Sequence, residues 1–66
     1  PPWTEDDRIV MACIRVAKQR RLEDPFRAAQ YAKGWTRERW DAALVEYQTK
    51  EAERFRSQHL AAAEHT

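Results

Sequence analysis

Apolar residues recur along this chain of 66 residues with the three- and four-residue spacing of helices that bury one face. The first such stripe follows a threonine and three acidic residues, and it consists of Val10, Cys13, Ile14 and Ala17. Thr4 is a favourable N-cap, and Asp7 three positions later completes a capping box. The pattern therefore predicts a first helix over residues 4–21.

A shorter helix is predicted over residues 25–33. Asp24 is a favourable N-cap, and Pro25 suits the first helical position, where its missing N–H costs nothing. The side chains expected to face inward are Phe26, Ala29 and either Tyr31 or Ala32. Gly34 follows directly, and it can end the helix because a left-handed backbone conformation costs glycine little.

The third helix is predicted to begin at Thr36 and to run through residue 50 and onward. The Thr36 hydroxyl can accept a hydrogen bond from a backbone N–H of the first turn. Trp35 and Trp40 then occupy the two positions of a hydrophobic staple, which fixes the corner between the second and third helices. The packed face of this helix is expected to hold Trp40, Ala43, Leu44 and Tyr47.

The apolar pattern weakens over residues 51–66, which we expect to form a C-terminal helical extension. Phe55 and Leu60 are the large apolar residues of this segment. It either frays in solvent or packs on another chain through these two side chains. Along the helix surface, oppositely charged side chains about one turn apart can pair, namely Glu46 with Lys50, Glu51 with Arg54 and Glu53 with Arg56.

Together the elements predict an all-α fold, a small three-helix bundle with helix-turn-helix-like order and an extended C-terminal helix. Composition agrees, since the chain has eleven alanines, one glycine and no asparagine, and few residues that favour turns and hairpins. We expect one three-helix domain over residues 1–50, followed by the extension over residues 51–66. Because the chain begins with two prolines and no methionine, we also expect it to be part of a longer protein.

Charge and cysteine content limit the kinds of partner and the cellular compartment that we expect. The net charge is +1, from 12 basic and 11 acidic side chains, so any electrostatic binding must come from local clustering. The single Cys13 cannot form an internal disulfide, which favours an intracellular compartment, either a nucleus or a bacterial cytoplasm and nucleoid. No apolar run approaches the ~18 residues of a membrane span, so no membrane partner is expected.

The sequence offers little for catalysis or metal binding. Cys13, His59 and His65 lack the spacing of a zinc site, and one glycine cannot build a phosphate-binding loop. A helical chain of this length also leaves little room for a pocket that excludes water. We therefore expect no enzyme activity, no catalytic residues, no metal site and no cofactor.

Two segments resemble a known family. Pro2, Trp3 and Thr4 followed by the acidic residues 5–7 are similar to the start of a Myb/SANT repeat, and residues 37–40 resemble the segment around its last core tryptophan. The resemblance covers residues 2–47. It implies a three-helix domain with Trp3 and Trp40 in the core, and with Phe26 in place of the middle tryptophan.

The resemblance implies that the third helix lies in the major groove of double-stranded DNA, with Arg37 and Arg39 facing DNA. Further phosphate contacts are expected from basic residues on the first two helices, namely Lys33, Arg20, Arg21, Lys18 and Arg15. On this interpretation the chain is the DNA-binding module of a larger regulatory or DNA-maintenance protein.

The alternative is a SANT-like protein-interaction or oligomerisation module with no direct DNA contact. SANT-type members of the family bind proteins, and balanced charge suits that interpretation. Phe55 and Leu60 would then anchor a partner or a second copy on the C-terminal helix. Arg37 and Arg39 also have a purely structural interpretation, in which Arg37 pairs with Asp41 and long arginine side chains cover aromatic rings.

Overall fold

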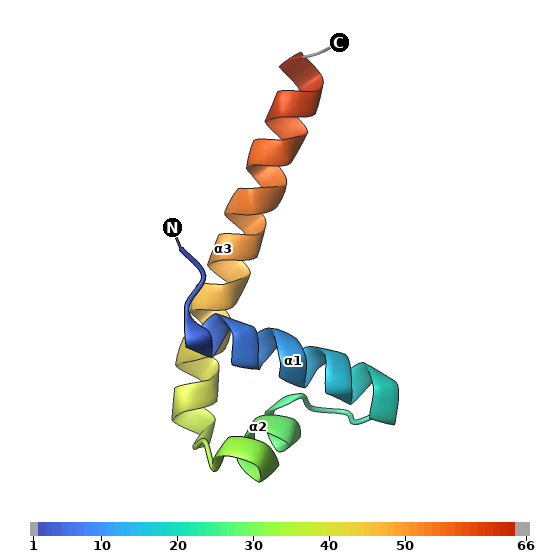
Figure 1. Cartoon of the computed structure of the whole chain (residues 1–66), viewed down its shortest axis with the longest axis vertical. Coiled ribbons are helices and arrows are strands. Elements are labelled where there is room, and N and C mark those ends of the chain that lie inside the picture. The colour runs from blue at the N-terminus through green and yellow to red at the C-terminus, as the bar shows by residue number, and fades with distance from the viewer. Residues whose placement is uncertain (1, 65–66) are drawn as a thin grey trace.

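Three helices make up the computed structural model, which describes the backbone of residues 2–64 and the side chains of residues 2–58 (Figure 1). Helix α1 spans Glu5–Arg20, α2 spans Phe26–Lys33 and α3 spans Arg37–Glu64. The described residues contain no strand. The predicted all-α three-helix fold with a long last helix is thus confirmed.

Helix α1 begins with the predicted capping box. The Asp7 N–H donates to Thr4 Oγ1 at 3.2 Å, and the Thr4 N–H donates to Asp7 Oδ2 at 2.8 Å. The C-terminal end of α1 could not be predicted from composition, because the residue there in the left-handed conformation is Arg21, with a φ of 58°. The Arg21 N–H donates to the Ala17 carbonyl, and the next residue, Leu22, donates its N–H to the same carbonyl at 2.9 Å.

Helix α2 is capped at both ends by the residues that the sequence predicts for this role. Asp24 Oδ1 accepts a hydrogen bond from the Phe26 N–H at 3.0 Å. Pro25 precedes the helix with helical dihedral angles, so the helix begins one residue later than predicted. At the other end Gly34 has a φ of 67°, and its N–H donates to the Gln30 carbonyl.

The corner between α2 and α3 is built as predicted. Thr36 Oγ1 accepts from the Arg39 N–H at 3.1 Å, so the hydroxyl caps the first turn of α3. The Trp35 and Trp40 rings lie 6.5 Å apart and are inclined at 53°, as a hydrophobic staple requires. Both tryptophans are buried, so the pair holds the entry angle of α3 from inside the core.

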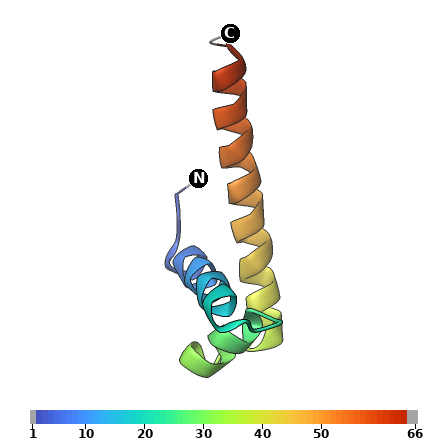
Figure 2. The same cartoon turned by 90° about the vertical axis from the view of Figure 1, so that its right-hand side faces the viewer.

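The hydrophobic core lies where α1 packs against the first turns of α3 and against α2 (Figures 1 and 2). Its fully packed members are Val10, Cys13, Ala29, Trp35, Trp40 and Ala43. The alanines let the helix backbones approach closely, and the tryptophans supply most of the apolar volume. Trp3 is half-buried and extends this packing outside the helices, with its ring 5.7 Å from that of Tyr47.

One ion pair ties α1 to α3 across the core. Lys50 Nζ lies 2.5 Å from Asp7 Oδ2, and the two side chains are 14% and 1% exposed. The expected pairing of Lys50 with Glu46 is therefore wrong, because the Lys50 side chain turns inward to reach a carboxylate that packing has removed from water. Periodicity along a single helix carries no information on this contact.

Beyond this ion pair α3 leaves the bundle and projects away from α1 and α2 (Figures 1 and 2). The side chains of residues 52–58 are exposed, and Phe55 is 69% exposed. The predicted C-terminal extension is helical as far as Glu64. The Leu60 side chain, the other predicted anchor, lies outside the described residues.

Candidate functional site

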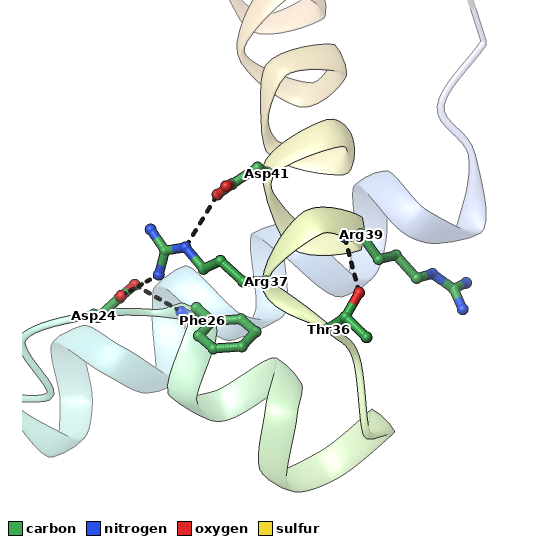
Figure 3. Close-up of polar contacts among 6 residues, drawn as sticks. All are labelled: Asp24, Phe26, Thr36, Arg37, Arg39 and Asp41. Carbon is green, nitrogen blue, oxygen red and sulfur yellow. Dashed lines mark hydrogen bonds and ion pairs between the residues drawn. The ribbon is translucent and has the colours of Figure 1, made fainter.

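Arg37 stands on the first turn of α3, where DNA contact was predicted, but its guanidinium is engaged within the chain. It forms an ion pair with Asp24, and its Nε lies 3.3 Å from Asp41 Oδ1 (Figure 3). The guanidinium also lies over the Phe26 ring, 5.1 Å from the ring centroid. Arg37 therefore joins the start of α2 to the start of α3. Its pairing with Asp41 and its position over an aromatic ring agree with the structural interpretation, whereas the ion pair with Asp24 was not predicted.

The titration behaviour of this pair agrees with the geometry. The hydrogen bond from Arg37 lowers the pKa of the Asp24 carboxyl below its ordinary value, and the Phe26 N–H adds to this effect. The same hydrogen bond raises the pKa of Arg37. Each group thus favours the charged form of the other, and Arg37 is largely neutralised inside its own chain.

Arg39 extends from α3 on the side away from Arg37 (Figure 3). Its Nη2 lies 3.4 Å from Asp6 Oδ1 in the first turn of α1, and its guanidinium lies over the Trp35 ring at 4.5 Å. The side chain is about half exposed, at 56%. Arg39 therefore covers the tryptophan staple and also links α3 to α1.

The exposed surface at the start of α3 is not cationic. Glu38, Asp41 and Glu46 are exposed there, together with Ala42 and Val45. With both arginines paired to carboxylates, this surface offers no excess positive charge to a phosphate backbone. The electrostatics thus give little support to contact between this helix and the major groove.

The other predicted DNA contacts lie elsewhere, on α1, α2 and the turn between them. All five are exposed and form no ion pair with any residue of the described range; they are Arg15, Lys18, Arg20, Arg21 and Lys33. The structure brings two of them, Arg20 and Lys33, to the same groove together with Arg27. Sequence reasoning did not find this groove, because it depends on how α1 and α2 pack.

The groove lies between α1 and α2 and has a volume of about 730 Å³. It is open to solvent along one side. Its apolar surface comes from both helices and the turn between them, and consists of Ile9, Ala12, Cys13, Val16, Leu22, Ala28, Tyr31 and Ala32. Its polar lining is Arg20, Arg27, Gln30 and Lys33, so no carboxylate lies among the described lining residues.

Two large apolar side chains of this groove are accessible to a partner. Tyr31 is 95% exposed and Leu22 is 38% exposed. The prediction that Tyr31 or Ala32 faces inward is wrong for both, since both side chains are exposed. The reason is that α2 has only eight residues and buries Ala29 alone, so its last turn extends past the part that α1 covers.

Cys13 forms part of the groove floor and is 6% exposed. Burial raises the pKa of its thiol, and the nearby Lys33 charge opposes that shift. The thiol is therefore neutral near pH 7 and behaves as a small apolar side chain. No cluster of side chains that could hold a metal ion occurs in the described part of the chain.

Comparisons with known proteins leave the chain without an assigned family. No family model, no curated protein and no solved structure matches it. The resemblance to Myb/SANT repeats therefore stays a prediction. Among the helices of the described range, none combines the length and the apolar character that a membrane span needs.

Proposed function

We propose that this chain is a protein-interaction module, whose α1–α2 groove receives a segment of a partner protein. The observation that carries the proposal is the groove itself, an open apolar surface of about 730 Å³ in a chain with a small core. Exposed apolar surface rimmed by polar residues marks interaction sites in small proteins. Tyr31 and Leu22 supply the kind of accessible large side chain that partners bury.

The state of the α3 arginines supports this function over DNA binding. Arg37 and Arg39 are held by carboxylates of the same chain and by aromatic rings. Breaking these contacts to reach DNA would cost part of the domain's own stability. A net charge of +1 also suits a protein partner, and so does the resemblance to SANT-type repeats. The free, buried Cys13 supports an intracellular location for such a module.

Site-specific photo-crosslinking tests the proposal. A photo-reactive phenylalanine analogue at Tyr31, introduced into the protein in its own cells, should form adducts that resist nuclease and are digested by protease. The matched control places the same analogue at Ala42, which is exposed on α3 outside the groove. Absence of protein adducts at Tyr31, or equal adducts at both positions, would contradict the proposed function.

DNA binding remains the second candidate, and one observation favours it. Five cations that lack ion pairs within the described range lie on α1, α2 and the turn between them, and they could contact phosphates without disturbing the core. Titration of isotope-labelled protein with duplex DNA at low salt tests it. DNA binding predicts salt-sensitive shift changes at Arg15, Lys18 and Arg21, weakened by Arg21→Ala. If duplex DNA at low salt produced no shift changes at these residues, this candidate would be removed.

A further inference from the structure

We propose that the occupant of the α1–α2 groove is an acidic amphipathic helix of a partner protein. Its apolar face would lie on the groove floor, and its flanking carboxylates would meet Arg20, Arg27 and Lys33. This inference rests on the proposed function and adds the chemistry of the partner.

The shape favours a helix over a small molecule. The groove is open along one side and is bounded by two helices, whereas small-molecule sites enclose most of their ligand. Helix α2, which forms one wall, has eight residues and is therefore about 12 Å long at the usual rise per residue. That length matches about two turns of a docked helix, enough for anchors at positions i, i+3, i+4 and i+7.

The positive charge at the border of the groove indicates which polar residues the partner should carry. Arg20 and Arg27 line the groove together with Lys33, and no carboxylate is among its described lining residues. Asp24, which precedes α2, is paired with Arg37, and the nearby charge of Arg27 also helps to lower the pKa of its carboxyl. None of Arg20, Arg27 and Lys33 forms an ion pair within the described residues, so electrostatic complementarity favours a partner with Asp or Glu beside its apolar face.

The floor leaves space for large side chains of the partner. Ala12 and Ala28 stand on facing helices, and Ala32 continues the same surface on α2. Small residues at these positions create the hollow, while Tyr31 and Leu22 stand at its border as exposed apolar contacts. Leucine or phenylalanine side chains on the docked helix would fill the hollow and bury Tyr31, and aromatic residues of this kind often dominate binding energy.

A defined peptide series tests the inference on the whole chain. The probe is a synthetic helical peptide of about four turns, with Leu and Phe at i, i+3, i+4 and i+7 and Glu at the flanking positions. One control peptide keeps the apolar face and has Lys at those flanks. The other has the same composition as the probe in an order without an apolar face. Calorimetry gives the dissociation constants, and amide shift mapping of labelled protein gives the site.

The Glu-flanked peptide should bind with shift changes centred on Ala12, Ala28 and Tyr31. The double variant Arg27→Glu/Lys33→Glu should weaken it by about tenfold or more, since like charges then face each other. The same variant should gain affinity for the Lys-flanked peptide. The matched control Arg8→Glu/Arg56→Glu changes two exposed cations outside the groove, and it should alter affinity by less than about twofold. Circular dichroism checks that each variant keeps its helices.

Several results would overturn the inference. Equal binding of Glu- and Lys-flanked peptides would show an apolar groove without charge selection. Shift changes away from the groove, no binding by either peptide, or binding only of anionic lipid vesicles would contradict a helical occupant. If the peptides fail while photo-crosslinks still form at Tyr31, the groove binds a protein of other chemistry and the proposed function stands. If both fail, both proposals are wrong.

Discussion

Arg21 and Gly34 end successive helices in nearly the same left-handed backbone conformation, with φ values of 58° and 67°. In both cases the N–H of this residue donates to a carbonyl four positions earlier, Ala17 for Arg21 and Gln30 for Gly34. The conformation is easily adopted by glycine, whereas any residue with a Cβ meets its own backbone there. Gly34 therefore suits this backbone conformation, whereas Arg21 adopts it at a cost in free energy.

Substitutions at these two turns should change stability in opposite directions. Gly34→Ala should lower the free energy of unfolding by about 1 kcal/mol. Apart from Gly34 and its two neighbours in the chain, no heavy atom lies within 4 Å of where the added Cβ would stand, so the cost comes from the backbone conformation. Arg21→Gly should raise the free energy of unfolding by about 0.5–1 kcal/mol. Urea unfolding followed by circular dichroism measures both, and a loss of stability in Arg21→Gly would contradict the assigned geometry.

Local signals in the sequence predict most of this fold. The capping box at Thr4, the cap at Thr36 and the tryptophan staple depend only on residues a few positions apart, so their chemistry can be recognised in advance. Arg21 could not be recognised, because its conformation follows from the path of the chain and not from its side chain. The α1–α2 groove could not be predicted either, since helix packing alone determines which alanines face each other.

The two arginines of α3 also combine a local contact that the sequence predicts with distant contacts that it does not. Their positions were predicted from the sequence, and so was the i, i+4 pairing of Arg37 with Asp41. Their other partners are 13 and 33 positions away along the chain, in Asp24 and Asp6. Contacts at such separation depend on how α3 packs against α1 and against the turn that precedes α2. They turn two residues that suggest DNA recognition into side chains that hold the bundle together.

Lys50→Met tests the ion pair across the core. Removing the ammonium leaves the Asp7 carboxylate buried without its charged partner, and its Oδ1 already lacks a hydrogen-bond partner among the described residues. We expect the melting temperature to fall by more than about 5 °C. Adding Asp7→Leu to Lys50→Met should restore part of this loss, because no buried charge then remains. The control Glu46→Gln removes the neighbour that does not pair with Lys50, and a similar fall there would contradict the assignment.

Stability should depend on pH through Asp7 and Asp24. A hydrogen bond from Lys50 lowers the pKa of Asp7, and one from Arg37 lowers that of Asp24. Near pH 4 the unfolded chain therefore binds more protons than the folded chain, so the free energy of unfolding rises with pH there. It should be level above about pH 5 and fall steadily as the pH drops through about 4 and below. Asp7→Asn/Asp24→Asn should flatten this acid limb, and an unchanged slope would exclude these two carboxylates as its source.

Substitutions at Trp40 and Arg39 should show how much a buried core side chain and an exposed side chain each contribute to stability. Trp40 is 1% exposed, and Trp40→Ala should cost about 3–5 kcal/mol, enough to unfold much of so small a domain. Arg39→Ala removes an exposed contact with the Trp35 ring and a surface ion pair, and should cost only about 1 kcal/mol. If α3 bound DNA through Arg39, Arg39→Ala would weaken the binding of duplex DNA, whereas our assignment predicts no change in it. Because we assign binding to the groove, Arg39→Ala should keep full affinity for the Glu-flanked peptide, measured by calorimetry on the folded variant.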